Sequence, residues 1–276
     1  MDTDLRSTVI HVLRSILALV SSVFLGAGGL LLGALLFTAT VFLAGVESPA
    51  VVIVLSLVFV QGVGCIGVAL TYIRLRPVVT SVIGDVLGFP EYVRDFSVDA
   101  TVPDFEGWAI IVAGYVVALG SAFAGATIVS QFQVETGQNA AAEIGMENPE
   151  VLLLLIPASI LLIGPGEELL FRGIVQGRLR EVFSPITAVV TASFVFAMLH
   201  WFALSGGSPT GNLVAAGLLI GPAIVLGAAY EYTDNIVVPS LIHGIYNATL
   251  FTLLYVIIAF SDVLEEAAPQ AMVVLA

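Results

Sequence analysis

Long apolar runs separated by short polar stretches make up most of this chain. A helix of about 20 apolar residues crosses the hydrocarbon core of a bilayer, so each run is long enough for one transmembrane helix. Helices are expected because a helix bonds its backbone polar groups internally, as lipid requires. The pattern therefore predicts an all-α fold, a polytopic transmembrane helical bundle of about seven to eight spans. The runs occupy residues 15–46, 50–73, 107–130, 151–180, 186–204, 212–230 and 236–260.

Composition agrees with a membrane location. Apolar residues make up 59% of the 276 residues and charged residues only 11%, whereas a soluble domain carries about 25% charged residues. The mean hydropathy of +1.08 is correspondingly high. The single cysteine, Cys65, lies inside an apolar run, which excludes a disulfide framework or a cysteine-rich metal site within one chain. We expect an integral protein of the cell membrane, surrounded by the lipid bilayer.

The stretch between the second and third runs, 77–106, has a different character. It mixes apolar and charged residues and contains three prolines, Pro77, Pro90 and Pro103. This mixture predicts a cytoplasmic loop with a short interfacial helix. We accordingly divide the chain into N-terminal spans with this loop (1–106), a core membrane domain (107–262) and a tail (263–276).

The basic residues indicate an orientation. All eight are arginines, and only Arg172 lies inside the membrane core, since Arg178 and Arg180 stand at the very end of the fourth run. If the N-terminus is cytoplasmic, the other seven all fall on the cytoplasmic side, as the positive-inside rule requires. We therefore predict a cytoplasmic N-terminus and an acidic tail on the opposite side. The seven arginines are Arg6, Arg14, Arg74, Arg76, Arg94, Arg178 and Arg180.

The net charge of −13 and the absence of lysine are unusual. Acidic, lysine-free loops resemble those of proteins from extreme halophiles, where carboxylates keep the surface hydrated and high salt screens their repulsion. This interpretation concerns the host, a halophilic archaeon or similar organism, and not the activity. We expect no nucleic-acid partner.

Residues 164–173, GPGEELLFRG, place three charges inside an apolar run. A charge in the bilayer core costs several kcal/mol unless it is paired or hydrated, so such residues are functional candidates. Glu168 and Arg172 are four residues apart and share a helix face, so they can form an ion pair. Glu167 is rotated by about 100° and needs a partner from another helix. The alternative is that both glutamates only stabilise a helix end or the bundle interior.

Histidine is scarce, and two of the three histidines lie in spans. His200 lies near the end of the fifth run and His243 early in the seventh, followed after four residues by Asn247. His11 precedes the first span and is interpreted as an interfacial residue. A lone histidine in an apolar helix usually only packs, but two histidines, an asparagine and an unpaired glutamate in one bundle indicate a site.

Depth limits which of these residues can meet. At 1.5 Å per residue, Glu167 lies roughly 20 Å and His200 roughly 23 Å from the arginine-bearing ends of their spans. His243 lies only about 10 Å from the same end by this count. A tilted span, a kink at Pro239 or a break at Pro165 could remove the mismatch.

Three short motifs together resemble a known family. EELLFR (167–172), FAMLH (196–200) and HGIYN (243–247) occur in this order. They are similar to the Glu-Glu-x-x-x-Arg, Phe-x-x-x-His and His-x-x-x-Asn motifs of the CPBP family. That family comprises type II CAAX prenyl endopeptidases and related bacteriocin-processing or immunity proteins. The resemblance covers about 151–260 and does not extend to the first three spans.

The resemblance implies an intramembrane endopeptidase, a hydrolase acting on peptide bonds. Glu167 and His200 would hold and deprotonate a water molecule. His243 and Asn247 would stabilise the tetrahedral oxyanion. The substrate would be a membrane-anchored protein or peptide, and the family name implies prenylated CAAX termini, although no prenyl pocket can be identified from the sequence. The supporting residues would be Glu168, Arg172 and Phe196.

Metal dependence is left open by the residues. Glu167, His200 and His243 could form a zinc site with one position left for water. However, the sequence has no closely spaced histidine pair such as His-Glu-x-x-His on one helix. We favour a site without a metal or other cofactor and keep zinc as the alternative.

Two other functions fit part of the pattern. A non-catalytic immunity or scaffold protein of the same fold would need no complete set of motifs, whereas all seven motif positions are filled here. A proton-coupled transporter also uses intramembrane glutamate, histidine and arginine. No repeat between the two halves of the chain supports the transporter.

Overall fold

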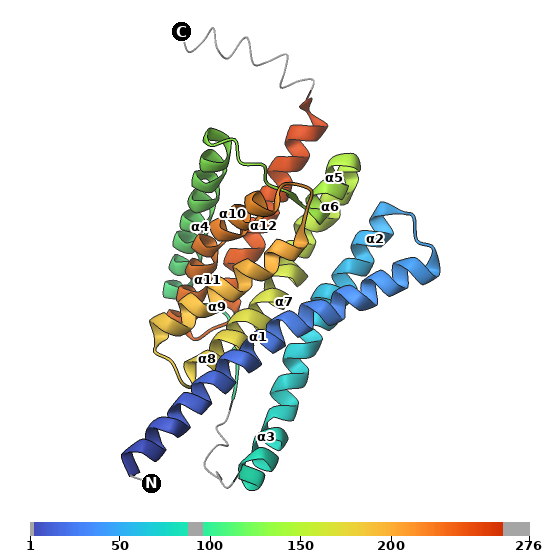
Figure 1. Ribbon diagram of the computed structural model, residues 1–276. Helices are drawn as coiled ribbons and strands as arrows, with labels where there is room; N and C mark the ends of the chain where they lie inside the picture. The colour runs from blue at the N-terminus through green and yellow to red at the C-terminus, as the bar shows by residue number, and fades with distance from the viewer. Residues whose placement is uncertain (1–2, 88–95, 262–276) are drawn as a thin grey trace.

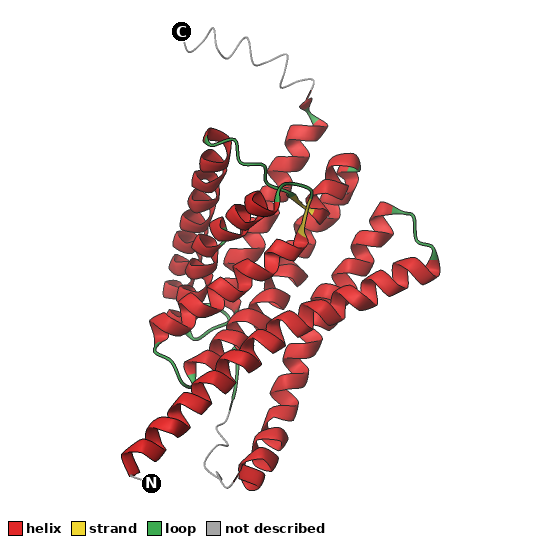
Figure 2. Ribbon diagram, viewed as in Figure 1, coloured by secondary structure: helices red, strands yellow, loops and turns green. Residues whose placement is uncertain are grey.

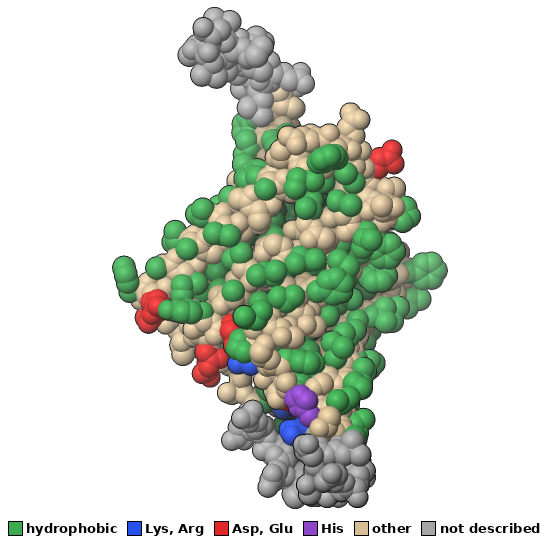
Figure 3. All heavy atoms as spheres, turned by 60° about the vertical axis from the view of Figure 1, so that its left-hand side comes forward, with side chains coloured by type: hydrophobic (Ala, Val, Ile, Leu, Met, Phe, Trp, Pro, Cys, Tyr) green, Lys and Arg blue, Asp and Glu red, His purple; other side chains and the backbone are tan. Residues whose placement is uncertain are grey.

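A computed structural model describes residues 3–87 and 96–261, which form a bundle of long helices (Figure 1). Within these residues, 7 helices are long and apolar enough to cross a membrane. On the face shown in Figure 3, hydrophobic side chains are spread over the whole surface, and the arginines that can be seen lie in its lower part. The chain is therefore an integral membrane protein, and the predicted all-α polytopic bundle is confirmed.

Each predicted apolar run corresponds to one span. The first span is α1 (Thr3–Ala44), the third α4 (Phe105–Gln131), and the seventh α12 (Val237–Ala259). The others are built from consecutive helical pieces. Span two consists of α2 (Pro49–Ser56), the π-helix η1 (Leu57–Gly67) and α3 (Val68–Leu87). Span four consists of α6 (Pro149–Ala158), η3 (Ser159–Ile163), α7 (Gly164–Glu168), η4 (Leu169–Gln176) and α8 (Gly177–Arg180). Span five consists of α9 (Pro185–His200) and η5 (Trp201–Ala203), and span six of α10 (Pro209–Leu218) and α11 (Ile220–Thr233).

Small elements connect the spans at the end opposite the N-terminus. Helix α5 (Ala140–Glu147) follows the two-residue strand β1 (Gln138–Asn139). Strand β1 pairs in antiparallel fashion with β2 (Leu204–Ser205), which follows the fifth span. Figure 2 shows this pairing joining two connections that are far apart in sequence.

The second span is longer than the sequence predicts. Helix α3 does not end at Pro77 but continues to Leu87, so the first part of the expected loop is helical. The hydroxyl of Thr80 donates to the carbonyl of Arg76 at 2.8 Å, one turn earlier. Residues 88–95, including Arg94, lie outside the described residues, as does the tail 263–276, and residues 96–104 have no regular secondary structure.

The segment 96–104 determines where the seventh span begins. It runs along span four, because a Cβ added at Gly173 would lie 3.2 Å from Val98. It then bonds to the start of α12, where the Ile236 amide donates to the carbonyl of Asp99 at 2.9 Å. Gly173 lies about 10 Å above Arg180 at 1.5 Å per residue. Helix α12 therefore starts inside the bundle, above this segment, and not at the level where span four ends (Figure 1).

Two glycines allow span four and α12 to touch through their backbones. A Cβ added at Gly164 would lie 2.6 Å from the carbonyl oxygen of Ser240. One added at Gly244 would lie 2.7 Å from Cα of Ile160. Real Cβ atoms do not approach other atoms so closely, and small residues are a common means of bringing membrane helices together. This crossing places His243, next to Gly244, beside the glutamates that follow Gly164.

The crossing leads to a prediction for stability. We expect Gly244→Ala to lower the thermal unfolding midpoint, since overpacking costs about 1–3 kcal/mol. The matched control is Gly120→Ala in α4, where nothing lies within 4 Å of an added Cβ. Alanine is preferred over glycine in a helix by up to about 1 kcal/mol, so this control should not lower the midpoint. A Gly244→Ala protein that unfolds at or above the wild-type temperature would contradict the described crossing.

Helix α1 contacts η1 in a similar way. Added Cβ atoms at Gly29 and Gly33 would lie 2.6 Å and 2.5 Å from the carbonyl oxygens of Gly64 and Phe59. The pattern Gly29-x-x-x-Gly33 is a known signal for close packing of membrane helices. The N-terminal span is thereby fixed against the span that carries η1.

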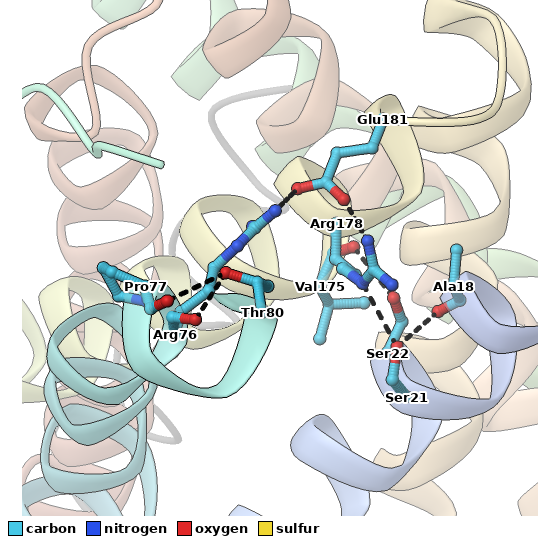
Figure 4. A network of polar contacts seen from close by, with 9 residues as sticks. All are labelled: Ala18, Ser21, Ser22, Arg76, Pro77, Thr80, Val175, Arg178 and Glu181. Atoms are coloured by element: carbon cyan, nitrogen blue, oxygen red, sulfur yellow. Dashed lines mark hydrogen bonds and ion pairs between the residues drawn. The ribbon is translucent and has the colours of Figure 1, made fainter. Parts of the chain in front are cut away.

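An ionic cluster ties three segments together at the arginine-bearing end (Figure 4). Glu181, which follows α8, contacts Arg76 of α3 through Oε1 and Arg178 through Oε2. The Arg178 guanidinium also donates to the hydroxyl of Ser21 in α1 at 3.3 Å. Arg180 pairs separately with Glu231 of α11 at 2.8 Å.

Candidate active site

The motif residues surround one cavity of about 570 Å³. Spans two, four, five and seven contribute most of its polar lining, and most of the other lining side chains are apolar. A few convergent polar groups in an apolar cavity are typical of sites for small molecules or peptides. The polar or charged lining side chains are Ser56, Gln61, Asn139, Glu167, His200, His243, Tyr246 and Asn247.

Glu167 lies at the centre of this group and is 8% exposed. Its Oε1 accepts a hydrogen bond from the side-chain amide of Gln61 at 2.8 Å. Its Oε2 lies 3.7 Å from Nε2 of His200 and 3.9 Å from Nε2 of His243. Among the described residues Oε2 has no hydrogen-bond partner. One carboxylate oxygen is therefore fixed by Gln61, while the other faces two imidazole nitrogens.

The ring of His200 is held by the helix that carries it. Its Nδ1 lies 2.8 Å from the carbonyl oxygen of Phe196, one turn earlier in α9. A carbonyl only accepts, so Nδ1 carries the proton, and in the neutral ring Nε2 presents a lone pair to Glu167. The Phe196 ring also packs against His200, with ring centroids 4.2 Å apart.

Glu168 is fully buried and bridges two partners. Its Oε2 pairs with Nε of Arg172 at 3.2 Å, which is the ion pair expected from the four-residue spacing. Its Oε1 accepts from Nδ1 of His243 at 2.8 Å, a contact that the sequence analysis did not anticipate. Arg172, also fully buried, donates to the carbonyl of Ala223 at 3.3 Å and lies 4.9 Å from the ring centre of Phe196.

The mismatch in depth predicted for His243 does not occur. Because α12 starts at the level of Gly173, about 10 Å above Arg180, a further 10 Å along the helix brings His243 to the level of Glu167. The close contact between span four and α12 at Gly164 and Gly244 then brings His243 beside Glu167 at that level. The raised start of α12, set by the segment 96–104, was not among the explanations that the sequence suggested.

Asn247 lies in the same cavity, one turn beyond His243. Its side chain is half-buried and has no hydrogen-bond partner among the described residues. It thus lines the cavity without a hydrogen bond or ion pair to the other motif residues. His11, in contrast, is exposed on α1 and does not line the cavity.

Gln61 was missed by the sequence analysis. It lies in the π-helix η1, within the second apolar run, and is part of none of the three motifs. A glutamine in the middle of an apolar run is a polar group that lipid cannot satisfy, and this was the available signal. Its partner could not be identified, because 106 residues separate it from Glu167.

The fit to a metal can be tested on the side chains themselves. Glu167, His200 and His243 offer the oxygen and nitrogen donors that zinc prefers. As placed, however, no group of three histidine, cysteine, aspartate or glutamate side chains within the described residues could hold a metal ion. The three side chains as placed therefore do not form a ligand set, and no chemical step is assigned to zinc.

Comparison with known proteins agrees with the geometry. Residues 149–249 match a family model described as type II CAAX prenyl endopeptidase Rce1-like. The matched stretch includes all three motifs, from Glu167 to Asn247, whereas residues 1–148, with Gln61, lie outside it. No curated protein and no solved structure matches the chain.

Proposed function

We propose, from the premise that residues 149–249 form an Rce1-like domain of the CPBP family, that the protein hydrolyses peptide bonds within the membrane. Its substrate would be a membrane-anchored protein or peptide. One observation carries the proposal. The unpaired Oε2 of the Glu167 carboxylate and the Nε2 atoms of two histidines converge within 4 Å in a cavity.

Two acceptors face the position of the attacking water. Glu167 Oε2 and the lone pair of His200 Nε2 are 3.7 Å apart, a distance that one water can span by donating to both. The oxygen lone pairs of that water then point away from both acceptors, towards a substrate carbonyl. Glu167 takes a proton as hydroxide attacks the carbonyl carbon. The same proton then passes to the leaving amine as the carbon–nitrogen bond breaks.

The charges of the site support a role for His243 as a donor. Glu167, Glu168 and Arg172 together carry one net negative charge, which a protonated His243 cancels. A neutral total is the favourable arrangement for buried charges. In this state Nδ1 donates to Glu168 and Nε2 also carries a proton. His243 Nε2 and the free amide of Asn247 would then donate to the tetrahedral oxyanion.

A matched pair of histidine variants tests the proposal. The purified full-length protein is incubated with a panel of lipid-anchored fluorogenic peptides, with and without a chelator. We expect the wild type to cleave at least one peptide and His200→Ala to lose about 10²-fold or more of kcat/KM. His11→Ala, which changes an exposed histidine outside the cavity, should match the wild type. The proposal fails if the wild type cuts no peptide or if His200→Ala cuts as fast as the wild type. Loss of activity with chelator would instead favour zinc.

A further inference from the structure

The cavity has a buried floor and an exposed mouth, and the two lie at different depths. The floor consists of side chains that are almost fully buried, such as Ala223, Leu226 and Ile242. The exposed lining residues, Asn139, Ala140 and Ala203, lie in the connections joined by β1 and β2. The mouth is therefore at the end of the bundle that carries this small sheet (Figure 2).

The catalytic side chains also lie nearer to that end. His200 is the last residue of α9, and the connection that contains Ala203 follows at once. The other end of α9, Pro185, is about 22 Å away at 1.5 Å per residue. In a hydrocarbon core about 30 Å thick, the site lies in the half towards the mouth.

Apart from Arg172, which lies in the site, the arginines that the structure describes lie at the opposite end. Arg76 and Arg178 share Glu181 there, as Figure 4 shows, and the N-terminus of α1 lies at the same end (Figure 1). The connections at the mouth end, 45–48, 132–148 and 201–208, contain no arginine or lysine. Arginine and lysine mark the cytoplasmic side, and acidic residues contribute little to this rule.

We infer that the mouth of the cavity opens on the non-cytoplasmic side of the membrane. What this orientation implies for the substrate rests on the proposed function. The substrate is a polypeptide whose anchor lies in the bilayer and whose scissile bond lies just inside the non-cytoplasmic leaflet. A C-terminally lipidated protein held on the cytoplasmic leaflet would present its peptide bond at the wrong end of the bundle.

The side of the mouth can be measured without any substrate. The only native cysteine, Cys65, is fully buried. The wild type should therefore take up no label and serves as the background control. Two alanine-to-cysteine variants of the full chain serve as reporters. Ala203→Cys lies at the mouth, and Ala100→Cys lies in the exposed part of 96–104 at the opposite end. Cells that express each variant are treated with a membrane-impermeant maleimide before and after permeabilisation.

We expect Ala203→Cys to be labelled in intact cells and Ala100→Cys only after permeabilisation. Asn139→Cys, on β1 at the mouth, provides a second reporter if Ala203→Cys does not accumulate. Labelling of Ala100→Cys in intact cells overturns the inference. Failure of both mouth cysteines to label in intact cells, with labelling after permeabilisation, overturns it as well.

The consequence for the substrate is tested separately. A peptide that the wild type cuts in detergent is fused to a single-span anchor, either on the non-cytoplasmic or on the cytoplasmic side, and expressed with the protein. We expect cleavage of the first fusion only, at a rate at least tenfold above the second. Cleavage of the cytoplasmic fusion alone overturns the inference and leaves the proposed function intact. If no peptide is cut in detergent, the proposed function fails while the labelling still reports the side of the mouth.

Discussion

Replacing Glu167 by glutamine is expected to reduce kcat by about 10²–10⁴-fold, the usual contribution of a general base. Glutamine keeps the shape of the side chain, and its amide oxygen can still accept from Gln61. It cannot take the proton of a water held between positions 167 and 200. Because the substrate does not contact the lost charge before the reaction begins, KM should change far less than kcat.

The measurement is a steady-state comparison of purified proteins on one anchored peptide. The matched control is Glu147→Gln, an exposed glutamate of α5 that does not line the cavity. It should retain the wild-type kcat. A Glu167→Gln protein that keeps more than about a tenth of the wild-type kcat would exclude Glu167 as the base.

Breaking the buried ion pair of Glu168 and Arg172 is expected to have the largest effect on stability. Both side chains are 0% exposed. Removal of one partner from a buried pair costs about 3–5 kcal/mol, since the other charge stays buried without compensation. Arg172→Met and Glu168→Gln should each lower the free energy of unfolding by this amount. The double variant should lose less than the sum of the two, because it leaves no unpaired charge.

Thermal or denaturant unfolding of the detergent-solubilised proteins gives the loss of unfolding free energy for each of the two single variants and for the double variant. Arg180→Met provides the control, since Arg180 and Glu231 form a more exposed pair, with side chains 36% and 26% exposed. Such a pair contributes at most about 1 kcal/mol. Additive losses in the Glu168–Arg172 cycle, or single losses no larger than that of Arg180→Met, would show that the pair does not stabilise the bundle.

Much of this fold is predictable because lipid imposes simple rules. The apolar runs coincide with the spans because only long apolar helices satisfy the membrane. The Glu168–Arg172 contact is equally local, since four residues along a helix bring two side chains to one face. Both depend on the sequence within a single segment.

The features that the sequence did not reveal depend on contacts between distant segments. Gln61 reaches Glu167 only because spans two and four pack together. The depth of His243 depends on the segment 96–104, which lies below the start of α12. A count along the chain assumes that α12 begins at the same level as the end of span four, and this segment raises its start. Glu168 serves both Arg172 and His243, a sharing that no spacing within one motif can show. Pro77 did not end its helix, so the apolar pattern alone placed that boundary too early.

The central claim is that Glu167 activates a water molecule and does not itself attack the peptide. A single turnover of the full-length protein on an anchored peptide in ¹⁸O-labelled water tests this most directly, with mass spectrometry of both the product and the protein. Direct attack by water predicts one ¹⁸O atom in the new C-terminal carboxylate and none in Glu167. Attack by the carboxylate would pass through an anhydride, whose hydrolysis can transfer an oxygen of Glu167 to the product and leave ¹⁸O in the protein. Appearance of ¹⁸O in Glu167, or a product without it, would contradict the account.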